Sequence, residues 1–192
     1  MRIIAGTKRS LPLKALEGDT TRPTLDRYKE TLFNVIQSEV PGSLFLDLYA
    51  GSGSIGIEAL SRGAKRAVFV EQDVNAVKII VENLRFTKLE NDADVIRSDV
   101  NSFISGLKCV NFDVIYIDPP YNKGLERKSL ERLAGKEFIN PDMIIIVEAD
   151  INTDFSYVND LGFVIYKTKN YKSNKHVFIK KKQPVVFDSI ND

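Results

Sequence analysis

Short, almost wholly apolar runs recur through the middle of the chain, and segments with helical patterning separate them. Such runs are typical of strands buried on both faces, because the helices that connect parallel strands cover both sides of a sheet. The sequence therefore predicts a doubly wound α/β fold with its reactive loops at the carboxyl ends of the strands. The runs cover 44–49, 67–72, 93–98, 112–117 and 143–149, and the clearest helical segments cover 54–62 and 73–88.

The beginning of the chain carries two further elements. Residues 2–16 predict a strand pair, and residues 25–39 predict a helix with Thr24 as its cap. We therefore expect a small N-terminal β-hairpin and helix at 1–42, forming an RNA-facing extension of the main domain at 43–192.

The end of the chain predicts an antiparallel pair of strands. Residues 163–171 and 175–182 are rich in β-branched and aromatic side chains and turn near Ser173. We expect Val177 and Ile179 to face the core and the lysines to face the other way. This C-terminal hairpin would complete a mostly parallel, seven-stranded sheet.

Composition narrows the class of protein. The chain has 192 residues and 43% hydrophobic side chains, which suits one globular domain. It contains no apolar run of the roughly 20 residues that a membrane span needs, and its start lacks the apolar core of a secretion signal, so we expect a cytoplasmic location. A single cysteine, Cys109, excludes an internal disulfide, and we expect no metal site. The lone histidine, His176, is more typical of packing or surface than of catalysis.

Charge is spread unevenly although the formal net charge is only +1. Residues 1–30 carry seven basic and four acidic groups, and residues 161–187 carry seven lysines and no acid. If the two basic ends meet, they form a positive face suited to a phosphate backbone; the alternative is a pair of ordinary solvated faces. The candidate RNA contacts are Arg2, Lys8, Arg9, Arg22, Arg27, Lys172, Lys175 and Lys181.

A glycine-rich turn follows the first predicted strand. Gly51, Gly53 and Gly56 have the GxGxxG spacing that lets a backbone turn sharply beside a ligand and lets a helix pack closely on the strand. Dinucleotide-binding enzymes share this turn, and a purely structural turn is a further alternative. Glu71 closes the second strand 20 residues after Gly51, where a carboxylate can accept hydrogen bonds from both ribose hydroxyls. Together they indicate a ligand that contains adenosine.

Two more strand ends carry candidate residues. Asp99 follows the third strand, where it could contact an adenine, cap a helix over 100–104, or do both. Asp118, Pro119, Pro120 and Tyr121 follow the fourth strand. The prolines stiffen the loop, so the Asp118 carboxylate and the Pro119 carbonyl can accept hydrogen bonds from one planar amino group while Tyr121 stacks on its base. The alternative is a rigid loop that simply leaves a strand.

These motifs resemble those of a known family. The sequence LDLYAGSGSIGIEALSRGA at 46–64, Glu71, and DPPY at 118–121 resemble class I methyltransferases, which have a Rossmann-like fold. The segments RIIAG at 2–6 and RPTLDRYKETLFN at 22–34 are similar to the RsmD type, bacterial methyltransferases of guanine N2 in small-subunit 16S ribosomal RNA. The resemblance covers nearly the whole chain.

The resemblance implies a cofactor, a substrate and their sites. It implies S-adenosyl-L-methionine as cofactor, ribosomal RNA of the small subunit or an assembly intermediate as partner, and Asp118 to Tyr121 as the catalytic residues around the target base. We also expect a monomer. The implied cofactor residues are Asp47, Tyr49, Ala50, Gly51, Ser52, Gly53, Gly56, Glu71, Gln72, Asp99 and Val100.

Three alternatives remain at this point. Adenine-N6 or cytosine-N4 methylation would use the same acceptor geometry. An NAD-dependent oxidoreductase would explain the glycine turn and Glu71, but it leaves DPPY without a role. A non-catalytic RNA-binding protein would explain the basic ends, but it leaves the cofactor constellation unexplained.

Overall fold

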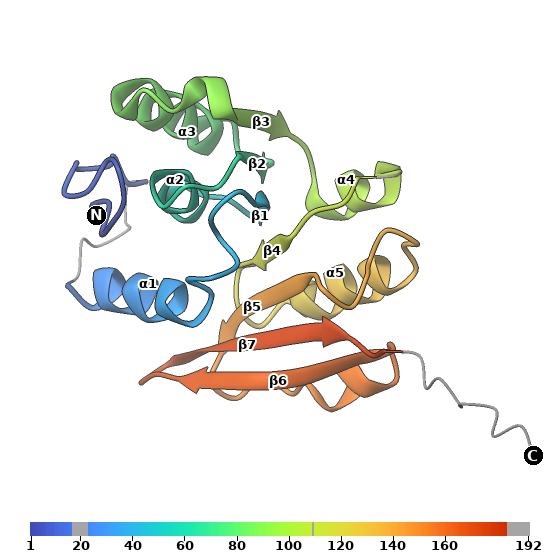
Figure 1. Cartoon of the computed structure of the whole chain (residues 1–192). Helices are drawn as coiled ribbons and strands as arrows, with labels where there is room; N and C mark the ends of the chain where they lie inside the picture. Colours follow the sequence, from blue (N-terminus) through green and yellow to red (C-terminus); the bar gives the residue numbers. More distant parts are fainter. Residues whose placement is uncertain (17–22, 109, 184–192) are drawn as a thin grey trace, which may run out of the picture.

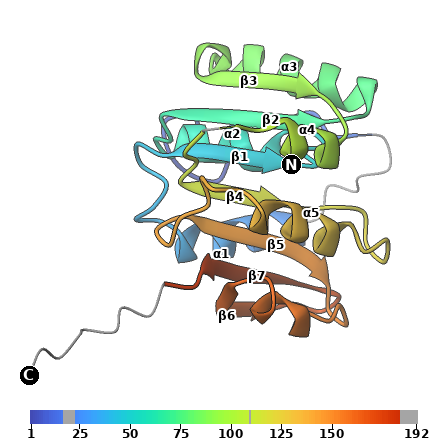
Figure 2. The same cartoon turned by 90° about the vertical axis from the view of Figure 1, so that its right-hand side faces the viewer.

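A seven-stranded sheet with helices on both faces organises the chain (Figures 1 and 2). The computed structural model describes residues 1–16, 23–108 and 110–183. Its strand order is β3-β2-β1-β4-β5-β7-β6, and β7 alone runs in the opposite direction to the other six strands. The predicted fold class is therefore confirmed. The strands are β1 (Leu44–Leu48), β2 (Arg66–Glu71), β3 (Ala93–Arg97), β4 (Val114–Ile117), β5 (Ile144–Asp150), β6 (Phe163–Asn170) and β7 (Asn174–Lys181).

Two apolar layers fix the helices to the sheet. Helices α1 to α3 pack on one face and α4 and α5 on the other, as the two sides of Figure 1 show. Strand β1 lies between β2 and β4, so the strand order reverses there and opens a crevice at the carboxyl ends of β1 and β4. The helices are α1 (Pro23–Val35), α2 (Ser54–Ser61), α3 (Val74–Thr87), α4 (Val100–Gly106) and α5 (Leu125–Ala134), with short 3-10 turns at Glu90–Asp92 and Ser156–Asn159.

The N-terminal hairpin differs in detail from the expectation. Instead of two strands, the segment makes a single antiparallel bridge between Arg2 and Pro12. The reason is that the next backbone donors point away from the hairpin: the amides of Ile4 and Ala5 donate to the Glu58 carboxylate, and the Thr7 amide donates to a carbonyl of α2. The segment therefore pairs with α2 as much as with itself.

Helix α1 ends at Val35, four residues before the predicted end. Two turns follow in its place, and they carry Ile36 and Val40 into the core. The side chains of Ile3, Leu32 and Phe33 also belong to the apolar cluster that packs beneath β1. The boundary at residue 42 stays a prediction, while the packing shows that the N-terminal elements and the sheet share one core.

The predicted two-faced character of the last strand was wrong. His176 and Phe178 are as buried as Val177 and Ile179. The reason is the position of β7 between β5 and β6, since an interior strand is covered on both faces. The exposed pattern falls instead on the edge strand β6. Within the described ranges, no helix is long and apolar enough to cross a membrane.

Candidate active site

The glycine turn joins β1 to α2 and is tied to both. Asp47, near the end of β1, is fully buried, and its Oδ2 accepts the amide hydrogen of Gly56 at 2.9 Å. Gly51 and Gly53 have φ values of 55° and 77°, which favour glycine. A Cβ at Gly56 would lie 2.3 Å from Cε1 of Phe69, so only glycine lets α2 approach β2 this closely. The predicted roles of these glycines in turning and packing match this geometry.

Glu71 holds the other side of the turn. Its Oε2 accepts from the Gly51 amide at 2.9 Å, and its Oε1 accepts from the amides of Gln72 and Asp73 at 2.8 and 2.9 Å. A carboxylate offers about four lone-pair sites, so these three bonds leave room for a ligand hydroxyl. The structure shows that Glu71 anchors the glycine loop, and its predicted role as a ribose acceptor stays a prediction.

The pKa of Asp47 lies far above its usual value. Burial raises its pKa to about 8; the Gly56 amide opposes this shift, and the negative charge of Glu71 adds to it. The site therefore contains a carboxyl group that is largely protonated near neutral pH. A positive charge placed beside Asp47 would favour its ionised form.

The predicted adenine contacts lie at neighbouring strand ends. Asp99 precedes α4 and its Oδ1 accepts from the Ser102 amide at 2.8 Å, which makes it a helix cap, one of the two roles weighed for it. Val100 is buried in the first turn of α4, and Gln72 is exposed after β2. An adenine contact for these residues stays a prediction.

One cavity brings the glycine turn and Asp118 of the DPPY loop together, whereas Glu71, Asp99, Val100 and residues 119–121 are not among its lining residues. It has a volume of about 200 Å³, and Asp47, the turn at 49–52 and Asp118 line it. Tyr49 adopts a positive φ of 61°, and its hydroxyl lies 3.0 Å from Oγ of Ser129 on α5. Such a backbone conformation is strained for tyrosine and is often found at functional sites. The further lining residues that sequence reasoning missed are Met1, Tyr28, Lys29, Ser54, Ile55, Tyr116, Glu148 and His176.

Glu148 is the centre of a polar network under the DPPY loop. It lies on β5, and its carboxylate accepts the hydroxyls of Tyr116 and Tyr121, each at 2.7 Å, and the side-chain amide of Asn174 at 2.6 Å. Nε2 of His176 lies 3.0 Å from the same carboxylate. Burial alone would raise the pKa of Glu148, but His176 and the tyrosine hydroxyls outweigh it and hold the pKa below its usual value. The network fixes the Tyr121 ring.

The network continues to the outside of the molecule. His176 is 1% exposed, and its Nδ1 lies 3.0 Å from the Tyr171 hydroxyl. The ring of Tyr171 packs on that of Tyr28 from α1, with 4.1 Å between centroids. Of the two placements predicted for His176, packing or surface, the structure shows packing, and its neighbours place it beside the cavity. A glutamate inside the apolar run at 143–149 was the one sequence signal that could have revealed this network.

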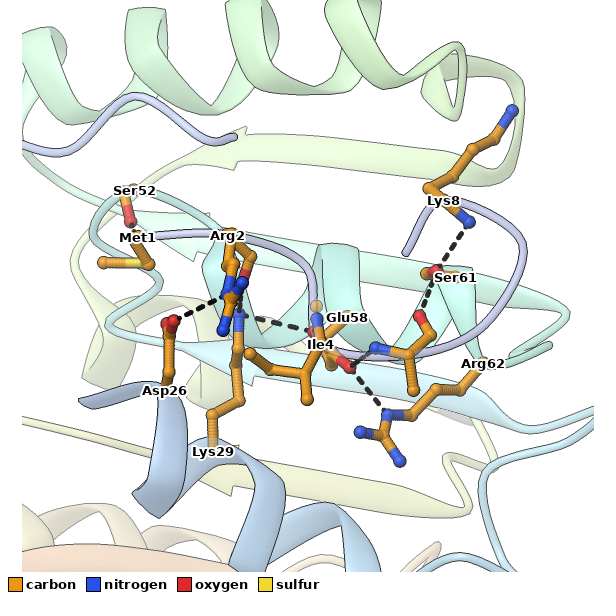
Figure 3. Close-up of polar contacts among 12 residues, drawn as sticks. Met1, Arg2, Ile4, Lys8, Asp26, Lys29, Ser52, Glu58, Ser61 and Arg62 are labelled. Atoms are coloured by element: carbon orange, nitrogen blue, oxygen red, sulfur yellow. Dashed lines mark hydrogen bonds and ion pairs between the residues drawn. The ribbon is translucent and has the colours of Figure 1, made fainter. Parts of the chain in front are cut away.

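A second buried carboxylate fastens the N-terminal segment over the site (Figure 3). Glu58 on α2 is fully buried and accepts from the amides of Ile4 and Ala5 and from Nε of Arg62, while Nζ of Lys29 lies 3.3 Å away. Burial lowers the pKa of Lys29, and Glu58 opposes that shift. This anchor places Met1 beside Ser52 of the glycine turn, with 3.8 Å between Sδ and Oγ.

The candidate RNA contacts do not gather in one place. Arg2, paired with Asp26 at 3.1 Å, lines a hollow with Arg9 and Arg27. Lys8 lies beside Ser61 at the far end of α2 (Figure 3). Lys172 follows β6, at the same end of the sheet as the active site.

Two candidates on β7 are engaged elsewhere. Nζ of Lys175 donates to the Thr153 carbonyl, and Nζ of Lys181 donates to the Ile139 carbonyl. Lys181 also lies at the end of the sheet opposite to the glycine turn. Arg22 lies outside the described residues. RNA contact by any of these groups stays a prediction.

Within the described part of the chain, no three His, Cys, Asp or Glu side chains form a group that could hold a metal ion.

Known proteins of similar sequence are named as methyltransferases. The chain is 38% identical over 152 residues to "Putative rRNA methyltransferase YlbH" of Bacillus subtilis, covering 78% of this chain and 83% of that protein. It is also 38% identical over 152 residues to "Ribosomal RNA small subunit methyltransferase D" of Haemophilus influenzae, covering 78% of this chain and 79% of that protein.

Solved structures agree with these sequence relatives. "Putative methyltransferase yhhF" from Escherichia coli has a TM-score of 0.83 at 29% identity, covering 95% of this chain and 98% of that one. Fold and site together define a methyltransferase with a Rossmann-like sheet. The chain belongs to the family described as Conserved hypothetical protein 95, whose model matches residues 1–180.

Proposed function

We propose that this enzyme transfers a methyl group from S-adenosyl-L-methionine to the exocyclic N2 amino group of a guanine in small-subunit 16S ribosomal RNA. The observation that carries the proposal is the single cavity in which the glycine turn meets Asp118 of the DPPY loop. Relatives that are 38% and 34% identical to this chain are named for ribosomal RNA of the small subunit, which supports this substrate and a cytoplasmic setting.

The residues present fit the cofactor. A Cβ placed on Gly51 would meet nothing within 4 Å, so the backbone of the turn is open on its ligand side. The buried Asp47 suits the positive charges of the methionine part, and Glu71 suits the ribose. Asp99 and Val100 would take the adenine. When bound, the cofactor supplies an electrophilic methyl carbon.

The target amino group needs help because its lone pair is delocalised into the base. In our proposal, the Asp118 carboxylate and the Pro119 carbonyl accept its two hydrogens and favour a pyramidal nitrogen whose lone pair points at the methyl carbon. The nitrogen–carbon bond forms as the sulfur–carbon bond breaks, and the nitrogen then releases one proton to Asp118 or water. Much of the acceleration comes from alignment of the two reactants.

Tyr121 would support the base from one side. Its ring follows the two prolines, and its hydroxyl is held by Glu148. Base stacking on an aromatic side chain is worth about 1–3 kcal/mol. The base must be unpaired or flipped out of a helix to reach Asp118.

Nucleoside analysis tests the substrate and the product together. Small-subunit RNA from cells that lack the gene is incubated with the enzyme and labelled cofactor, digested, and analysed by mass spectrometry. We expect N2-methylguanosine. N6-methyladenosine or N4-methylcytidine would keep the acceptor mechanism and overturn the substrate, and no transfer to naked RNA or to small subunits would contradict the proposed function.

A further inference from the structure

A second cavity opens between α1 and the turn that joins β6 to β7, which lie beside each other in Figure 1. Its volume is about 560 Å³. Three cationic side chains line it, Arg27 from α1 and Lys169 and Lys172 from the strand end and turn, and none of the lining residues that the structure describes is acidic. This groove is therefore a local concentration of positive charge in a protein whose net charge is only +1.

The floor of the groove is aromatic. Tyr28 and Tyr171 also line it, and their rings contact each other at an interplanar angle of 33°. The Tyr171 hydroxyl is bonded to the buried His176, so the floor is held by the same network that fixes Tyr121. A fixed aromatic surface flanked by cations suits a ligand that has both a planar base and a phosphate.

The groove and the active site are neighbours. Tyr28 lines both the groove and the cavity that contains Asp118. A chain that places one residue at Asp118 can therefore continue past Tyr28 into the groove. Single-stranded nucleic acid is a chain of this kind, with one base and one phosphate in each unit.

We propose that this groove binds the nucleotide next to the target base, with the neighbouring base on Tyr28 and Tyr171 and its phosphates on Arg27, Lys169 and Lys172. The inference rests on the proposed function and deepens it, because it assigns a subsite for the RNA strand beside the methylated residue. An acidic peptide would use the cations, but it would have no use for the aromatic floor.

Binding of a fluorescent ten-nucleotide single-stranded RNA at several salt concentrations tests the charged walls. We expect the double variant Lys169→Ala and Lys172→Ala to bind more weakly and its log-log salt slope to fall by about 0.7 for each lost phosphate contact. Lys65→Ala is the matched control, because Lys65 is exposed at the end of the sheet opposite to the groove. An unchanged slope, or an equal loss in the control, would overturn the inference.

Two substitutions of Tyr28 test the aromatic floor. Tyr28→Phe keeps the ring and should bind the RNA as the wild type does, whereas Tyr28→Leu should lose about 10-fold in affinity. Inorganic polyphosphate of similar charge should compete weakly and show no dependence on Tyr28. Equal binding of RNA by both variants, with melting temperatures unchanged, would mean that the groove attracts anions without reading a base.

Methylation of small-subunit RNA separates the two proposals. The double lysine variant should raise KM for RNA and leave the kcat at saturating RNA within a few-fold of wild type. If the wild type methylates guanine N2 while the double lysine variant keeps its KM, the groove inference fails and the proposed function stands. If the wild type binds RNA through the groove but transfers no methyl group, the proposed function fails instead.

Discussion

The two halves of the active site are built in different ways. The half proposed to hold the cofactor is local: Glu71 at the end of β2 accepts from Gly51 in the neighbouring turn, and Asp47 accepts from Gly56 within one strand–turn–helix unit. The half proposed to hold the base is assembled from distant segments, since the Tyr121 hydroxyl depends on Glu148, 27 residues away, and Glu148 on His176, 28 residues further on. A local half survives changes elsewhere in the fold, whereas an assembled half depends on tertiary packing.

Apart from Asp118 itself, the largest effect is expected from Glu148, at the centre of the assembled half. Glu148→Gln keeps the shape of the side chain but weakens the bonds that fix Tyr121, and a misplaced base costs on the order of 10²-fold in rate. We expect kcat to fall by that amount. For S-adenosylmethionine, the KM and the dissociation constant should each change less than about threefold.

Glu131→Gln provides the matched control, because Glu131 pairs with Arg127 on an exposed face of α5. Single-turnover experiments measure the rate of methyl transfer, and calorimetry measures the dissociation constant for S-adenosylmethionine. If Glu148→Gln lost cofactor affinity and rate to the same extent, the two halves would not be separable in the way the contacts indicate.

The reverse pattern is expected at Glu71, in the local half. Charge-assisted hydrogen bonds are worth about 1.5–3 kcal/mol, so Glu71→Ala should weaken cofactor binding by about 10- to 100-fold. Affinity for the single-stranded RNA should stay within a few-fold of wild type.

Asp73→Ala controls for loss of backbone order near Glu71. Asp73 caps α3, and this variant should lose about 1 kcal/mol of stability with little loss of cofactor affinity. Calorimetry that gives the same affinity for Glu71→Ala and wild type would remove Glu71 from the cofactor site.

A pH-dependent effect on stability, rather than on rate or affinity, is expected at Asp47. Its folded-state pKa of about 8 lies above the unfolded value, so the folded protein binds the extra proton, and stability falls as pH rises through this window. Asp47→Asn stays neutral and should not follow that fall. The stability difference between the two proteins should grow by up to about 1.4 kcal/mol per pH unit between pH 5 and 7. Urea denaturation gives the free energy of unfolding of both proteins at each pH. A difference between them that stays constant across that range would show that Asp47 is ionised in the folded protein.

The same contrast explains what sequence could predict. The sheet, the glycine turn and the DPPY loop were predicted because apolar runs and short motifs encode them within a few residues. The Glu148 network was missed because Glu148 and His176 meet only when β7 pairs with β5. The burial of β7 was misjudged for the same reason, since the predicted hairpin pairs β7 with β6 but nothing in its own residues shows that β5 lies along its other edge. The paired N-terminal strands gave way to contacts with Glu58, a partner 54 residues away from Ile4.

The central claim is that Asp118 accepts the target amino group while the glycine turn holds the methyl donor. Single-turnover methyl transfer from radiolabelled S-adenosylmethionine to small-subunit RNA, compared for wild type and Asp118→Ala, tests it most directly. We expect the variant to bind the cofactor within a few-fold of wild type and to transfer methyl groups about 10²–10³ times more slowly, the usual effect of removing one preorganised electrostatic partner. A variant that transfers methyl groups at the wild-type rate would contradict the account.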